Sequence, residues 1–204
     1  MNTAPGPTEL LAELLAARIL HDLGSPMASF SAILPQAADA DARDILIETA
    51  AELRARMRLF ALAFGTGDET PWNALPTLLQ GAPMAHRVRF EWPPSANILT
   101  PGRARLILSA ALLAAEALPR GGIVRIGQAA DGTVELLPQG RDAAWSPSFV
   151  ALMAGGSLAA ALAEGPRRVL APWVVVQAGA EAVMLDFALA AGTAIPPLVL
   201  TPAA

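Results

Sequence analysis

His21 and Asp22 are adjacent side chains whose types fit chemistry at a histidine. A carboxylate beside an imidazole can accept the proton of one ring nitrogen, which leaves the other nitrogen unprotonated and nucleophilic. Pro26 follows five residues after the histidine. It cannot donate the helical hydrogen bond to the Asp22 carbonyl, and its ring crowds that carbonyl, so we expect a bend just past His21. The pair predicts a catalytic histidine, His21, with Asp22 as its orienting acid.

The apolar pattern around this pair predicts a long helix with His21 beside its buried stripe. Apolar residues recur at steps of three and four, as helix packing requires: Leu20, Leu23, Met27, Phe30 and Leu34. One residue of helix turns the direction by about 100°. His21 therefore lies just off the stripe, where its imidazole can reach solvent.

Small residues dominate the face that His21 shares with its helical neighbours, which are Ala17, Arg18, Gly24, Ser25 and Ala28. Such a face is open to close approach by another macromolecule. We therefore predict partner contacts at Arg18, Gly24, Ser25 and Ala28. An isolated His-Asp pair on a helix is more commonly an ordinary solvated pair, and this alternative has to be weighed against the pattern.

Two long helices are expected at the N-terminus. The first covers residues 9–34, with Thr8 as its N-cap and Pro35 as its stop, and the second begins after Asp39 and continues to Phe64. A hairpin of two amphipathic helices cannot bury both apolar stripes alone, so the pattern favours a homodimeric four-helix bundle.

The charged residues of the second helix are expected on its outside. Most read as a solvated face with pairs such as Glu52 with Arg56. Arg54 and Arg58 are predicted as further contacts for a partner that docks beside His21.

A polar, glycine-rich break at residues 65–71 divides the chain into expected domains at 1–66 and 67–204. The second domain is expected to be an α+β layer of helices on a mixed sheet. Its helices are predicted at residues 72–80, 103–118, 146–155, 158–163 and 167–178. Its strands are predicted at residues 87–92, 123–128, 133–137, 183–188 and 198–200. Pro196 and Pro197 are expected to confine the last strand to an edge.

Composition excludes several classes of protein. The 204 residues contain no cysteine, so disulfides and thiolate chemistry are excluded. A net charge of −4 argues against a general nucleic-acid binder. The apolar run at residues 106–118 is too short to cross a bilayer, and the longer one after Val169 is interrupted by polar residues. We expect a cytoplasmic protein that binds neither nucleic acid nor membrane.

A histidine followed by an acid, with proline five residues after the histidine, resembles the phosphoacceptor box in the dimerisation and phosphotransfer domain of histidine kinases. Residues 102–122, followed by a strand and Asp131-Gly132, resemble the second domain of alphaproteobacterial histidine phosphotransferases of the ChpT type. This resemblance covers most of the chain and fades after Gly165. It implies a helical hairpin followed by a domain similar to a histidine kinase ATPase domain.

The second domain departs from a working kinase. The resemblance places Ser109 and Leu113 near two helix positions that are asparagines in kinases. One of these two asparagines binds Mg²⁺ there. The chain has no lysine and no glycine-rich loop suited to phosphates. We therefore expect a degenerate ATPase-like domain without nucleotide. His86, the other histidine, has no metal-ligand pattern around it and is expected at the surface.

The resemblance implies a histidine phosphotransferase of a two-component phosphorelay, which shuttles a phosphoryl group between receiver-domain aspartates through His21. Its expected partners are a second copy of the chain, the receiver domain of a hybrid histidine kinase, and a response regulator. No cofactor of its own is expected, because the receiver supplies Mg²⁺ during transfer. Alternatives are a divergent histidine kinase that uses ATP and a non-catalytic dimeric protein that binds response regulators.

Overall fold

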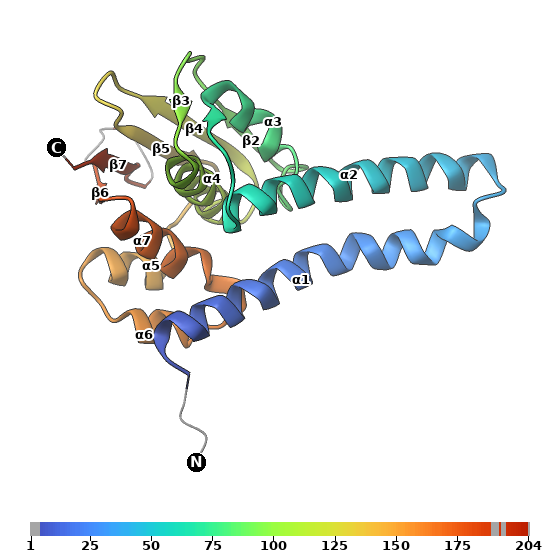
Figure 1. Ribbon diagram of the computed structural model, residues 1–204, viewed down its shortest axis with the longest axis horizontal. Coiled ribbons are helices and arrows are strands. Elements are labelled where there is room, and N and C mark those ends of the chain that lie inside the picture. The colour runs from blue at the N-terminus through green and yellow to red at the C-terminus, as the bar shows by residue number, and fades with distance from the viewer. Residues whose placement is uncertain (1–4, 189–191, 193–194, 204) are drawn as a thin grey trace.

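The computed structural model describes residues 5–188, 192 and 195–203, and it shows a helical hairpin followed by helices on a mixed sheet (Figure 1). The helices are α1 (Pro7–Ile33), η1 (Leu34–Gln36), α2 (Ala40–Phe64), η2 (Trp72–Ala74), α3 (Leu75–Leu79), α4 (Pro101–Glu116), α5 (Pro147–Met153), α6 (Leu158–Leu162), η3 (Pro166–Arg168) and α7 (Leu170–Ala180). The strands are β1 (Thr70–Pro71), β2 (Val88–Glu91), β3 (Ile98–Leu99), β4 (Gly122–Gln128), β5 (Val134–Gln139), β6 (Val183–Phe187) and β7 (Leu198–Pro202).

The hairpin confirms the two long N-terminal helices, with one change at the start. The N-cap of α1 is Gly6 and not Thr8, because Pro7 occupies the first helical position, where no N–H needs a partner. The Gly6 N–H donates to Glu9 Oε2 at 3.0 Å. Asp39 caps α2 as its sequence position suggests, and its Oδ1 accepts from the Ala42 N–H at 3.0 Å.

The five-stranded sheet has the order β2-β4-β5-β7-β6. Its β2 and β4 are parallel and its other neighbours antiparallel, which confirms the predicted mixed sheet. The prediction that the last strand lies at an edge is wrong, since β7 pairs with both β5 and β6. Pro196 and Pro197 precede the strand and therefore remove no N–H from its ladder, while Leu198 and Leu200 are fully buried.

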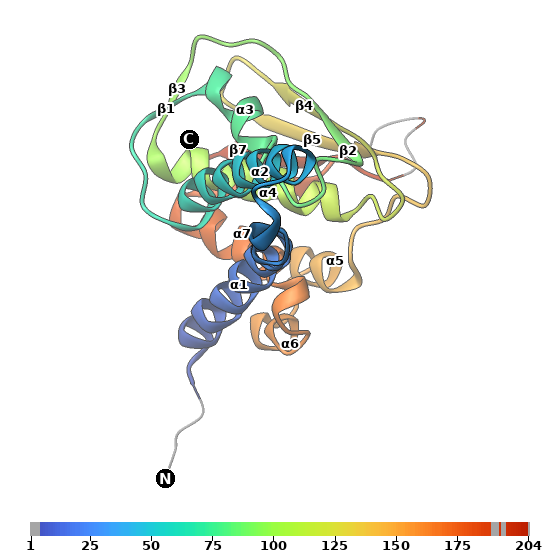
Figure 2. The same cartoon turned by 90° about the vertical axis from the view of Figure 1, so that its right-hand side faces the viewer.

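Helices α4 and α7 pack on the sheet, and the C-terminal half of α2 packs on α4. Figure 2, which looks along the hairpin, shows α2 nearer than α1 to the strands. The Ala63 carbonyl accepts from Ser109 Oγ at 3.1 Å and from Trp173 Nε1 at 3.2 Å. These bonds fasten the end of α2 to α4 and α7, and one apolar core continues from α2 into the sheet layer. The division at residue 66 stays a prediction.

A set of large apolar side chains on the hairpin is exposed in the single chain: Leu20, Met27, Leu34, Ile45, Ile47 and Met57. Leu20 is 71% exposed although it belongs to the predicted stripe, whereas Leu23 packs against the core. One hairpin therefore does not bury its whole stripe, and the four-helix bundle stays a prediction. None of the helices in the described part of the chain is long and apolar enough to span a membrane.

Candidate functional site

An open cavity of about 380 Å³ lies beside His21. Side chains of α1, of α2 and of the segment before β2 line it: His21, Asp22, Ser25, Pro26, Ser29, Thr49, Glu52, Arg56, Pro83 and His86. The hairpin and the region that follows it thus meet at the predicted catalytic pair.

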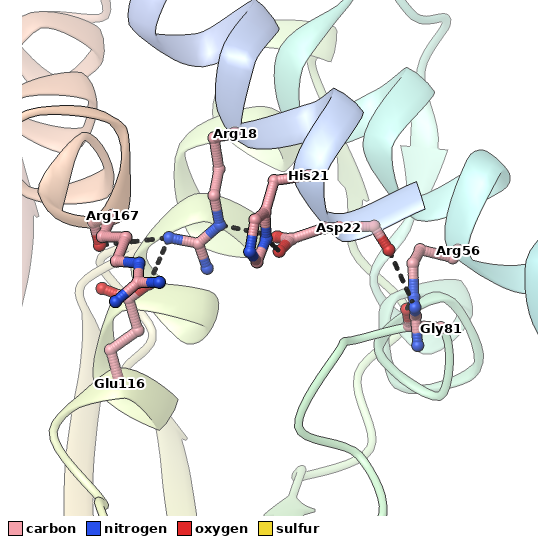
Figure 3. Close-up of polar contacts among 7 residues, drawn as sticks. All are labelled: Arg18, His21, Asp22, Arg56, Gly81, Glu116 and Arg167. Atoms are coloured by element: carbon pink, nitrogen blue, oxygen red, sulfur yellow. Dashed lines mark hydrogen bonds and ion pairs between the residues drawn. The ribbon is translucent and has the colours of Figure 1, made fainter. Parts of the chain in front are cut away.

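His21 is open to solvent while its acid is not. The His21 side chain is 68% exposed and the Asp22 side chain 10% exposed, and His21 Nδ1 lies 3.1 Å from Asp22 Oδ1 (Figure 3). An ionised carboxylate only accepts hydrogen bonds, so this contact assigns the proton to Nδ1. Nε2 then keeps its lone pair, and it is the ring nitrogen suited to nucleophilic attack.

Arg18 holds the carboxylate of Asp22 from behind. Its Nε donates to Asp22 Oδ2 at 2.6 Å, and its Nη1 donates to Glu116 Oε1 at 2.8 Å and to the Arg167 carbonyl at 3.2 Å (Figure 3). Burial alone would lower the pKa of Arg18, but Glu116 and Asp22 outweigh burial, so this pKa lies above its usual value. The side chain is 13% exposed. The expectation that Arg18 faces a partner is therefore not met, because its guanidinium is committed to internal contacts.

Glu116, the last residue of α4, is a member of this cluster that we did not single out from the sequence. Burial raises the pKa of its carboxyl group, and the nearby charge of Arg18 offsets this only in part. Its position in the sequence could have indicated this role, because Glu116 is the only charged residue in the apolar run at 106–118. A lone acid in such a run requires a buried partner.

Arg56 is buried, and our expectation that it lies on the outside of α2 is wrong. It is 7% exposed, its Nη1 donates to the Asp22 carbonyl at 3.0 Å, and its Nε donates to the Gly81 carbonyl at 3.5 Å. The Asp22 carbonyl is the one that Pro26 leaves without its helical donor, so Arg56 replaces the missing N–H. The expected pair with Glu52 is confirmed at 2.5 Å. Arg56 therefore supports the helix turn that carries His21.

The other predicted contact residues are exposed. Gly24, Ser25 and Ala28 lie at the surface of α1, and Ser25 lines the cavity. A Cβ added at Gly24 would meet no atom within 4 Å, so the fold of the chain does not require glycine there. Arg54 and Arg58 are exposed and do not line the cavity. Contacts of these five residues with a partner stay predictions.

His86 is exposed, as expected, but its place in the wall of the His21 cavity had no signal in the sequence. Among residues 5–188, 192 and 195–203, no group of three or more histidines and acids could hold a metal ion.

Comparison with known proteins identifies the family. Residues 73–195, more than half of the chain, match the family model of the histidine phosphotransferase C-terminal domain. The chain therefore belongs to the histidine phosphotransferase family. No curated protein matches the sequence.

Solved structures that match the chain include a bacterial phosphotransferase and a histidine kinase. A bacterial phosphotransferase solved at 1.7 Å has a TM-score of 0.74 and 22% sequence identity, over 98% of this chain and 97% of that one, which shows a shared fold. The histidine kinase AdeS of Acinetobacter baumannii has a TM-score of 0.40 and 9% identity, over 90% of this chain and 97% of that one, which is too low to define a shared fold.

Proposed function

We propose that this histidine phosphotransferase carries a phosphoryl group on His21 between the aspartates of two receiver domains. The observation that supports this most is the exposed imidazole of His21, whose Nδ1 lies 3.1 Å from a carboxylate oxygen of the nearly buried Asp22. This contact leaves Nε2 free and directed away from its own acid. The protein would act on receiver domains in the cytoplasm.

The proposed transfer balances without a proton donor. The Nε2 lone pair of His21 forms the bond to phosphorus, and the bond between phosphorus and the aspartyl oxygen of the donor breaks, its electron pair leaving with that carboxylate. The imidazole ring then carries a positive charge, which Asp22 stabilises through Nδ1. The second transfer reverses these steps toward the aspartate of the acceptor. Mg²⁺ that screens the phosphoryl oxygens would arrive with the receiver domain.

The exposed face of α1 supports close docking of a receiver. Gly24, Ser25 and Ala28 project no large side chain beside His21, and the space at Gly24 is open. The adjoining cavity of about 380 Å³ gives the reacting groups room. The proposed partners are the receiver domain of a hybrid histidine kinase and a response regulator, one as donor and the other as acceptor.

We propose further that two copies of the hairpin, within residues 1–66, associate as a four-helix bundle. Leu20 and Met27 of α1 and Leu34 of η1 recur every seven residues and are exposed in the single chain, which is the pattern of an unfilled helix interface. Burial of apolar surface contributes about 25 cal/mol per Å² to stability, which favours such association.

The region at 67–204 would contribute to phosphoryl transfer without binding a nucleotide. The two positions that correspond to kinase asparagines in the resemblance, Ser109 and Leu113, are buried. Ser109 is bonded to the Ala63 carbonyl and to Trp173 Nε1. Both side chains are therefore taken up by the packing of α4 against its neighbours and are not open to a nucleotide, which supports a degenerate ATPase-like domain.

The test is phosphoryl transfer from a radiolabelled receiver domain, with the wild type, His21→Ala and an ATP-only control side by side. We expect label on the wild type alone, and none from ATP. Label taken from ATP would favour a divergent kinase. Label on neither protein, with receiver binding retained by both, would favour a non-catalytic binding protein.

A further inference from the structure

A chain of three polar contacts connects α4 to the imidazole of His21. Glu116 Oε1 lies 2.8 Å from Arg18 Nη1, Arg18 Nε lies 2.6 Å from Asp22 Oδ2, and Asp22 Oδ1 lies 3.1 Å from His21 Nδ1 (Figure 3). Arg18 and Asp22, the two middle residues of this chain of contacts, each bind their two partners through different atoms. A rotation of the Arg18 guanidinium would therefore displace the Asp22 carboxylate, and with it the acceptor of the His21 proton.

Glu116 orients the guanidinium from the far side. The guanidinium is a rigid planar group, so a carboxylate on Nη1 determines where Nε points. The Arg167 carbonyl, from η3, also accepts from Nη1, at 3.2 Å. Both contacts come from the C-terminal region, whereas Arg18, His21 and Asp22 belong to α1. The orientation of the acid therefore depends on a region far away in sequence.

The burial of Glu116 indicates that it orients Arg18 more than it stabilises the fold. Burial raises the pKa of its carboxyl group, so ionising Glu116 in the folded protein costs free energy that Arg18 repays only in part. Its neighbours in the chain, Ala115 of α4 and Ala117 directly after α4, are buried and apolar. An apolar side chain would suit this environment at a lower solvation cost.

We propose that Glu116 is a positioning residue for phosphoryl transfer, which acts through Arg18 and Asp22 to keep the proton of His21 on Nδ1 and the lone pair on Nε2. The proposal rests on the proposed function of His21. It assigns the C-terminal region an indirect part in the reaction, because that region would orient the carboxylate of Asp22.

The test compares Glu116→Gln, Arg18→Gln and the double variant. The readouts are the rate of single-turnover transfer from a labelled receiver and the nitrogen-15 chemical shifts of His21, which report its tautomer. Because Glu116 acts through Asp22, its loss should slow transfer by no more than loss of the Asp22 contact itself. We expect a slowing of about 5- to 10-fold in Glu116→Gln, with a shift toward the Nε2–H tautomer. Because Glu116 acts through Arg18, the double variant should be no slower than Arg18→Gln.

The matched control is Glu91→Gln on β2, which breaks the exposed pairs of Glu91 with Arg89 of β2 and with Arg125 of β4. It should keep the wild-type rate and tautomer. If Glu116→Gln does not fold, Glu116→Leu removes the carboxyl group in favour of an apolar side chain and leaves the Arg18–Asp22 pair in place. That variant should fold and show the same slow transfer and altered tautomer.

Wild-type rate and wild-type nitrogen shifts in Glu116→Gln, or in Glu116→Leu, would overturn the proposal. Slowing without a change of tautomer would also overturn it, because Glu116 would then act by another route. Failure of the carrier function is seen separately, as label on His21→Ala or as label on neither protein, and the nitrogen shifts of His21 test the positioning role even then.

Discussion

Asp22→Asn isolates the contact that prepares His21 for attack. The substitution keeps the size of the side chain, but the amide can donate to Nδ1 and so permits the tautomer with its proton on Nε2. A hydrogen bond to a charged group contributes about 1.5–3 kcal/mol. His21 is 68% exposed, and competition with water reduces this to about 1–2 kcal/mol. At about 1.4 kcal/mol for each factor of ten, we expect transfer to slow by about 5- to 30-fold.

The assay is rapid-quench transfer from a labelled receiver in a single turnover, with nitrogen-15 spectra of His21 in the same samples. Asp44→Asn, at an exposed acid of α2, is the matched control and should behave as the wild type. An unchanged rate in Asp22→Asn, together with an unchanged tautomer, would refute the assignment of the proton to Nδ1.

Three further predictions follow from the site and the hairpin. Arg56→Met leaves the Asp22 carbonyl without a donor and should lower the free energy of unfolding by about 2–4 kcal/mol in chemical denaturation, whereas the exposed Arg54→Met should change it by less than about 0.5 kcal/mol; equal losses would contradict the buried role. Because the pKa of Glu116 is raised in the folded state, its favourable contribution is present below the unfolded value of 4.5 and is lost as pH rises through the folded pKa. The free energy of unfolding of the wild type should therefore fall relative to Glu116→Gln over that range, and a difference independent of pH would count against burial of the carboxyl group. Leu20→Glu should convert a wild-type dimer into monomers in sedimentation equilibrium, and a monomeric wild type would exclude the bundle.

Local patterns in the sequence predicted the long helices and the exposure of His21. The apolar steps of three and four continue over many turns, and one residue of helical rotation is enough to place His21 beside the stripe. The strands predicted at 123–128 and 133–137 leave only four residues between them, and in the structure β4 and β5 pair across this connection, where Gly132 has a φ of +84°.

Features that depend on distant parts of the chain were not predictable in the same way. Arg56 looked like any charged residue of an amphipathic helix, and it is buried because the chain around Gly81 lies against α2. The position of β7 inside the sheet, between β5 and the edge strand β6, follows from strand order, which proline content alone does not determine. Adjacency of His21 and Asp22 suggested an oriented imidazole, but only the structure identifies the nitrogen that Asp22 holds.

The measurement that tests the central claim most directly is the position of the phosphoryl group on the protein after transfer from a phosphorylated receiver. Phosphorus-31 and nitrogen-15 spectra of the labelled protein distinguish the two ring nitrogens of histidine. The account predicts a phosphoryl group on Nε2 of His21, with the proton on Nδ1 facing Asp22. A phosphoryl group on Nδ1, or on any residue other than His21, would contradict it.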